Sequence, residues 1–161
     1  MANYKIRKTQ NVGVVIRKMN LSDAWDIAQM WEFFSEVRYN TVPDIDAWLA
    51  LEMGLFQDPS YVCLVAEEDE KIVGFVDGQF KYEPAFSEVH LIARHSWVDE
   101  GRRGEGIGLK LYRKFYDVAA SGGASKIIIS SPPEGGPAKA ILKKLFDQEI
   151  KQHTINWVFE V

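Results

Sequence analysis

The sequence is poor in cysteine and histidine and has no long hydrophobic run. Its 161 residues include one cysteine, Cys63, and three histidines. One cysteine excludes an internal disulfide, and no Cys/His cluster has the spacing of a zinc site, so we expect no bound metal. No apolar run approaches the roughly 20 residues that a membrane-spanning helix needs. These absences exclude a disulfide-stapled domain, a zinc protein and a helical membrane protein.

An excess of positive charge is also missing. The 23 acidic residues outnumber the 19 basic ones, which gives a formal net charge of -4. This balance disfavours a nucleic-acid partner held by bulk electrostatics. The first eight residues carry charge but no apolar segment follows them, so they do not form a secretory signal. We therefore expect a cytoplasmic protein with neither a nucleic acid nor a membrane as its partner.

The rest of the composition is ordinary for a globular chain. Hydrophobic residues make up 47% and charged residues 26% of the sequence, which argues against disorder. The length lies in the range of a single domain, and no repeat, low-complexity tract or long linker divides the chain. We predict one domain over residues 1–161.

Turn residues divide the chain into short β-branched stretches and longer stretches with helical periodicity. Residues 88–98, 106–121 and 126–130 form a strand–helix–strand unit, which implies a right-handed parallel crossover. The predicted fold is α/β (α+β), a mixed and mostly antiparallel sheet with one central parallel β-α-β crossover, in the order β-α-α-β-β-β-α-β-α-β. The predicted strands cover residues 12–17, 61–66, 71–82, 88–98, 126–130 and 154–159, and the predicted helices begin near residues 24, 44, 106 and 137.

The most informative segment is a glycine-rich loop that joins a predicted strand to a predicted helix. Backbone N–H groups at a helix N-terminus lack partners within the helix, and the helix dipole adds partial positive charge there. Gly104, Gly106 and Gly108 remove the side chains that would keep a phosphate off the backbone. Arg102 and Arg103 can add charge-assisted hydrogen bonds. The loop is predicted to bind a pyrophosphate, and it fits neither the P-loop nor the Rossmann fingerprint.

Residues 103–108, Arg-Gly-Glu-Gly-Ile-Gly, match the Arg/Gln-x-x-Gly-x-Gly/Ala signature of the GNAT superfamily of N-acetyltransferases. Residues 17–24 resemble the first strand and helix start of that family, and the element order extends the resemblance over nearly the whole chain. The resemblance implies a GNAT-like fold with acetyl-CoA as the acyl donor, its pantetheine arm entering a splay between the fourth and fifth strands. The residues that it assigns to acetyl-CoA are Ser96, Trp97 and Val98 for the pantetheine, and Arg103, Gly104, Glu105, Gly106, Ile107 and Gly108 for the pyrophosphate.

The same resemblance implies direct acyl transfer to a primary amine of a small molecule or a peptide. The amine attacks the thioester carbonyl, a strand N–H stabilises the oxyanion, and CoA thiolate leaves. Leu142 stands where the family commonly has a general-acid tyrosine. Either the thiolate leaves unprotonated, or Tyr112 or Tyr116 supplies the proton. An alternative function stays open: a GNAT-like module that binds acyl-CoA with weak or no turnover.

An acceptor ammonium with a pKa near 10 must lose a proton before it attacks. Members of the family often carry a carboxylate on the fourth strand, and Glu88 and His90 are the candidates here, acting alone or through water. Strict alternation along the strand puts them on one face together with Arg94 and Ser96, and it puts His95 on the other. A structural role on the strand is the alternative for both candidates.

A second departure from the family lies at the C-terminus. The family usually ends in two strands, whereas the stretch after Ile150 is long enough for one. The acceptor site therefore either stands open or is completed by a second copy of the chain, as in a homodimer. Trp31, Phe34 and Tyr39, near the loop between the first two helices, either line this site or pack in the core.

Overall fold

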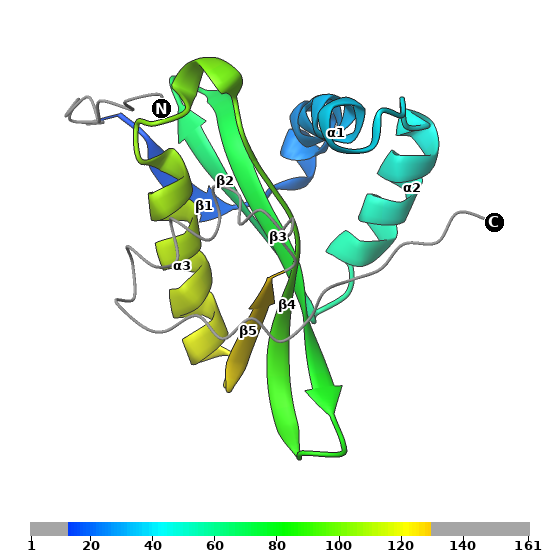
Figure 1. The fold of residues 1–161 in the computed structure, drawn as a ribbon, viewed down its shortest axis with the longest axis vertical. Coiled ribbons are helices and arrows are strands. Elements are labelled where there is room, and N and C mark those ends of the chain that lie inside the picture. Colours follow the sequence, from blue (N-terminus) through cyan, green and yellow to red (C-terminus); the bar gives the residue numbers. More distant parts are fainter. Residues whose placement is uncertain (1–12, 130–161) are drawn as a thin grey trace, which may run out of the picture.

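The computed structural model describes residues 13–129, apart from the side chains of residues 37–39, Tyr39 among them. Figure 1 shows these residues as a twisted sheet with helices on both of its sides. No helix in this part of the chain is long and apolar enough to cross a membrane. Outside the described residues lie the predicted helix from residue 137, the predicted strand at 154–159, and Leu142.

The described strands form one mixed sheet in the order β1-β2-β3-β4-β5. Strands β1 to β4 pair antiparallel with their neighbours, whereas β5 pairs with β4 in parallel. The connection from β4 to β5 runs through helix α3 (Ile107–Ser121), so the predicted parallel crossover is confirmed. The strands β1 to β5 cover Val15–Lys18, Tyr61–Glu68, Lys71–Glu83, Glu88–Val98 and Lys126–Ile129.

Helices cover both faces of the sheet. Helix α3 packs on one face, whereas α1 (Ala24–Tyr39) and α2 (Ile45–Phe56) lie on the other (Figure 1). Asp44 caps α2, because its carboxylate accepts a hydrogen bond from the Ala47 N–H at 3.0 Å. Two short 3-10 turns, η1 (Leu21–Asp23) and η2 (Glu100–Arg102), precede α1 and α3.

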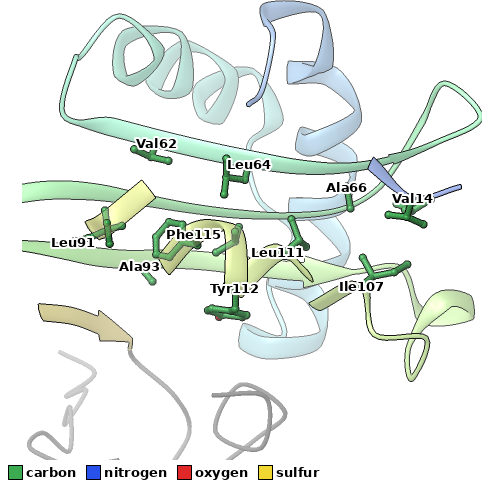
Figure 2. Close-up of a cluster of buried hydrophobic side chains, with 13 residues drawn as sticks. Val14, Val62, Leu64, Ala66, Leu91, Ala93, Ile107, Leu111, Tyr112 and Phe115 are labelled. Carbon is green, nitrogen blue, oxygen red and sulfur yellow. The ribbon is translucent and has the colours of Figure 1, made fainter. Parts of the chain in front are cut away.

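The sheet separates two hydrophobic cores. Figure 2 shows the core under α3, where Phe115, Leu91 and Ile107 are fully buried. Gly78 allows this close packing, since a Cβ at that position would lie 2.7 Å from Phe115 Cζ and 2.7 Å from the Ile92 carbonyl oxygen. This core fixes α3, and with it the glycine loop, against the sheet. The core on the opposite face includes Ile27, Trp48, Val65 and Phe75.

Strand β4 contains a bulge at Arg94. Across the β3–β4 ladder His95 lies opposite Asp77, whereas Ala93 lies opposite the next residue of β3, Gly78. Arg94 is therefore one extra residue in β4. A bulge of this kind restarts the alternation of side chains along its strand.

The bulge overturns two expectations that strict alternation supports. Alternation predicts that Ser96 shares a face with Glu88 and that His95 does not. The Ser96 side chain instead faces α3, where its hydroxyl oxygen lies 2.9 Å from that of Tyr112. The His95 ring faces α1, and its centroid lies 5.6 Å from that of Trp31. Both predictions are wrong because one inserted residue exchanges the two faces for the rest of the strand.

Candidate active site

The glycine loop between β4 and α3 presents backbone donors to open space. Gly104 and Gly106 both have a φ of 85°, in the left-handed region that favours glycine, and a Cβ on either would meet no atom within 4 Å. A hydrogen bond within the first turn of α3 runs from the Lys110 N–H to the Gly106 carbonyl at 3.1 Å. The amides of residues 107–109 therefore have no acceptor within the helix. This arrangement fits an anion such as a pyrophosphate.

Arg102 ties this loop to the sheet. Its guanidinium forms ion pairs with Glu68 at the end of β2 and with Glu105, whose Oε2 lies 2.9 Å from Nε. Hydrogen bonds to Glu68 and to Glu105 raise the pKa of Arg102 further above its ordinary value. Because its donors are directed to carboxylates of the protein, we assign Arg102 to shaping the loop.

Arg103 lies along the edge of β4. Its Nε donates a hydrogen bond to the Val98 carbonyl at 3.1 Å, and its guanidinium carbon lies 4.3 Å from the centre of the Trp97 ring. The Arg103 side chain is 46% exposed, and its ion-pair partner Glu100 is more exposed still. The stacking contact places a positive charge between the glycine loop and the end of β4.

Beyond the bulge, the backbone N–H and C=O groups of successive β4 residues point alternately toward β3 and away from it. The Asp99 N–H donates to the Val73 carbonyl at 3.1 Å. Because opposite residues of an antiparallel ladder alternate between bonded and non-bonded pairs, the backbone groups of Trp97 face β3. Those of Ser96 and Val98 face the other edge. Within the described part of the chain, β5 pairs only with the half of β4 before the bulge.

A tyrosine on α3 reaches the same stretch of β4. The Tyr112 hydroxyl oxygen lies 2.9 Å from the Ser96 hydroxyl oxygen. Burial raises the pKa of the Tyr112 phenol, so it is a neutral hydrogen-bond donor at neutral pH. Tyr116, one turn further along α3, is exposed. Tyr112 therefore contacts a residue of the β4 edge, and we choose it as the candidate proton donor.

Glu88 and His90 lie at the other end of β4. The Glu88 carboxylate accepts a hydrogen bond from the Lys126 ammonium at 2.5 Å and lies 2.9 Å from the His90 ring, and these contacts lower the pKa of Glu88 to about 2. A carboxylate of so low a pKa is a weak base at neutral pH. At about 3.3 Å per residue, His90 is roughly 20 Å along the strand from Ser96. The structure does not bring this pair to the glycine loop.

The bulge also builds a buried polar cluster that the sequence does not reveal. Glu52 on α2 is 3% exposed and Asp77 on β3 is 2% exposed. Arg94 pairs with both, its nitrogens lying 3.3 Å from Glu52 and 3.2 Å from Asp77. The Tyr61 hydroxyl donates to Glu52 at 2.6 Å, and burial together with the nearby carboxylates raises the pKa of Tyr61 far above its ordinary value. An aspartate inside an apolar strand is the one sequence signal that points to this cluster.

His95 joins the polar cluster to an aromatic wall. Its backbone N–H and its ring Nδ1 lie 2.7 and 3.1 Å from Asp77 Oδ1. The rings of Trp31 and Phe34, both on α1, meet the His95 ring edge-on with centroid distances of 5.6 and 5.8 Å. Phe34 also meets the Trp97 ring at 5.9 Å. Trp31 and Phe34 therefore line the face of β4 that carries His95, and they also pack against the core.

A comparison with known protein families shows which family the chain resembles. The sequence model of the acetyltransferase (GNAT) family matches residues 25–146. The match includes the glycine loop, the β4 bulge, α2, α3 and all of α1 but its first residue. No curated protein matches the chain at a significant level.

Solved structures share the fold at low sequence identity. A possible acetyltransferase from Clostridium difficile 630 matches with a TM-score of 0.75 and 16% identity, over 92% of this chain and 99% of that one. A ribosomal-protein-alanine N-acetyltransferase from Brucella melitensis biovar Abortus 2308 matches with a TM-score of 0.69 and 22% identity, over 92% and 99%. An aminoglycoside acetyltransferase from an uncultured soil metagenomic sample, in complex with sisomicin, matches with a TM-score of 0.71 and 15% identity, over 91% and 97%. Identities this low establish the fold and leave the acceptor open.

Proposed function

The chain belongs to the GNAT family of acetyltransferases, and on this premise we propose that it transfers an acetyl group from acetyl-CoA to a primary amine of a small molecule or a peptide. The proposal depends above all on one observation. Gly104 and Gly106 are left-handed and have open space where a Cβ would lie, and the first amides of α3 have no acceptor within the helix. Among the described residues, β5 does not pair with the part of β4 beyond the bulge, which leads into this loop. An anion-binding loop next to an unpaired strand edge suits a ligand in which a pyrophosphate is joined to an extended arm with amide groups.

We assign the acyl donor to this loop and this edge. The amides of residues 104–108 would hold the pyrophosphate, and Arg103 would add a charge-assisted hydrogen bond. The outward backbone groups of Ser96 and Val98 would pair with the pantetheine amides as an added strand does, while Trp97 supports Arg103. When bound, acetyl-CoA supplies a thioester carbonyl that is open to attack by an amine.

The protein then stabilises the negative charge that develops on the carbonyl oxygen and supplies a proton to the leaving sulfur. An outward N–H of Ser96 or Val98 donates to the carbonyl oxygen as negative charge grows there. The amine nitrogen forms a bond to the carbonyl carbon, the C–S bond breaks, and its electron pair leaves on sulfur. The Tyr112 phenol, through the Ser96 hydroxyl, gives a proton to that sulfur. The acylated nitrogen loses its remaining extra proton to water, and the Tyr112 phenolate takes a proton back from water. Tyr112 would thereby replace the tyrosine that the family commonly carries where this chain has Leu142.

Calorimetry and a thiol-release assay test this function together. The acceptors named for two structural neighbours suggest a panel with an aminoglycoside and a peptide that begins with alanine. We expect acetyl-CoA to bind and at least one amine to release CoA thiol. Binding without thiol release from any amine would favour the alternative, an acyl-CoA-binding module with weak or no turnover. Failure to bind acetyl-CoA at millimolar concentration would overturn both functions.

The sequence-based proposal that Glu88 and His90 supply the base has a direct test. If the pair removes the proton from the amine, the double variant Glu88→Gln/His90→Gln should lose at least about tenfold in kcat. Its affinity for acetyl-CoA should not change, because neither side chain lies near the glycine loop. Steady-state kinetics and calorimetry measure the two quantities. Unaltered turnover would dismiss the pair, an outcome that the pKa of about 2 for Glu88 favours.

A further inference from the structure

We propose that His95 takes the proton from the acceptor ammonium and that Asp77 is the positioning residue that orients it. This inference rests on the proposed function, since it names the group that prepares the amine for attack. The bulge at Arg94 turns the His95 side chain toward α1, while the backbone of the next residue, Ser96, faces the edge away from β3. Adjacent Cα atoms are about 3.8 Å apart. The Cα of His95 is therefore one residue away from the strand edge that we assign to the acyl donor.

Asp77 fixes which ring nitrogen carries the hydrogen. Its Oδ1 accepts a hydrogen bond from the His95 backbone N–H at 2.7 Å and lies 3.1 Å from ring Nδ1. A carboxylate oxygen can only accept, so Nδ1 is the donor. The lone pair then resides on Nε2, which has no hydrogen-bond partner within residues 13–129. A proton from an acceptor would arrive at Nε2, the position that imidazole uses in Asp-oriented general bases.

The carboxylate of Asp77 is itself held in place. Its Oδ2 lies 3.2 Å from the Arg94 guanidinium and 3.2 Å from the Tyr61 hydroxyl. Arg94 also pairs with Glu52 at 3.3 Å, so two buried carboxylates share one guanidinium. This arrangement leaves a surplus of negative charge behind the His95 ring. The surplus favours the approach of an ammonium.

Aromatic side chains hold the ring from the side of α1. Trp31 and Phe34 both meet the imidazole edge-on, so rotation of the ring away from Asp77 would displace packed side chains. The His95 side chain is 17% exposed, so part of it is open to solvent. The ring is thus oriented from two sides and open on a third.

The step moves one proton. An ammonium R–NH3+ gives a proton to Nε2, so the amine nitrogen gains a free electron pair and the ring becomes an imidazolium. The Nδ1 hydrogen stays on its hydrogen bond to Asp77. After acyl transfer the imidazolium releases the proton to water, and the neutral ring is restored. No further reactant is needed.

The variant His95→Gln removes the base and keeps a polar side chain. We expect kcat to fall at least about 100-fold, with the Kd for acetyl-CoA unchanged by calorimetry. Because the variant needs an amine that is already deprotonated, its rate should rise about tenfold per pH unit toward the pKa of the amine, near 10. Wild-type rates with a wild-type pH profile would overturn the role of His95 and leave the transferase proposal standing. A wild-type protein without turnover would overturn the proposed function itself.

The other titratable groups next to Asp77 do not produce the same pH dependence of the rate. Burial raises the pKa of the Tyr61 phenol and of the Cys63 thiol well above their ordinary values, so neither loses its proton in the tested range. His95 contacts Asp77 from β3, and the titratable and charged groups around Asp77 are Tyr61 and Cys63 from β2, Glu52 from α2 and Arg94 from β4.

The variant Asp77→Asn tests positioning by a readout other than activity. Nitrogen-15 spectra of the histidine rings should show His95 with its hydrogen on Nδ1 in the wild type, and a shift toward Nε2 in Asp77→Asn, with kcat at least about tenfold lower. The histidine signal that is missing from the spectrum of His95→Gln identifies the ring of His95. Asp58→Asn is the matched control, because Asp58 accepts from Ser60 and Gln79. It should keep the wild-type spectrum and rates.

The spectra test the positioning role of Asp77 independently of turnover. A wild-type ring with its hydrogen on Nε2 would overturn it. Circular dichroism checks that Asp77→Asn folds, because Asp77 is buried. His95→Gln leaves the buried carboxylate in place, and it tests the proposal even where Asp77→Asn fails to fold.

Discussion

Gly106→Asp is expected to weaken acetyl-CoA binding by at least about 100-fold, or about 3 kcal/mol. The new carboxylate would stand in the open space in front of the first amides of α3 and would accept their hydrogen bonds itself. It would also repel a pyrophosphate, so the loop loses donors worth roughly 1.5–3 kcal/mol each and gains a like charge. Isothermal titration calorimetry of acetyl-CoA against the purified variant measures the loss.

Two control variants separate charge from backbone strain. Gly106→Asn has nearly the same size, tolerates a left-handed φ better than most residues, and carries no charge, so it should retain more of the affinity than Gly106→Asp. Gly101→Asp adds the same charge to the same loop at a position where a Cβ meets open space and φ is not left-handed. Its affinity should stay within a few-fold of the wild type. Equal affinities for Gly106→Asp and the wild type would remove the basis for placing the pyrophosphate at this loop.

The glycine loop and the elements around it could be predicted because local sequence determines them. Leu111, Phe115 and Ala119 recur at helical spacing, and the structure has α3 from Ile107 with these residues buried. The chemistry of the loop resides in its backbone, so the glycines themselves mark it. The fourth strand likewise has the predicted bounds, 88–98.

The face that each β4 side chain takes could not be predicted, because it depends on pairing between strands. The His95 N–H donates to the Asp77 carboxylate at 2.7 Å, and one residue, Arg94, has no opposite partner on β3. Alternation along a single strand cannot detect such an insertion. The ion pair of Glu88 with Lys126 spans 38 positions and depends in the same way on the β4–β5 register. The sequence therefore predicts the glycine loop and its helix but not the buried polar cluster at the bulge.

Arg94→Met is expected to lower the free energy of unfolding by about 3 kcal/mol at pH 7. Methionine fills a similar volume but leaves Glu52 and Asp77 buried without the guanidinium that they share. Breaking a buried ion pair on one side is costly, because the charge that remains has no compensation. Urea unfolding followed by circular dichroism measures the difference.

The pH dependence of Arg94→Met distinguishes lost charge compensation from lost packing. Without the guanidinium, burial and mutual repulsion penalise the two charged carboxylates of the folded state, and protonation removes that penalty. The folded state then binds more protons than the unfolded state, so the variant should regain stability as the pH falls from 7 to 5. Arg102→Met is the matched control: its partners Glu68 and Glu105 are 23% and 28% exposed, and it should lose less than about 1 kcal/mol without such a gain. Equal losses in the two variants, or an Arg94→Met protein that loses stability toward pH 5, would mean that Arg94 supports the cluster by packing alone. In that case a charged Asp77 would not be what orients the His95 ring.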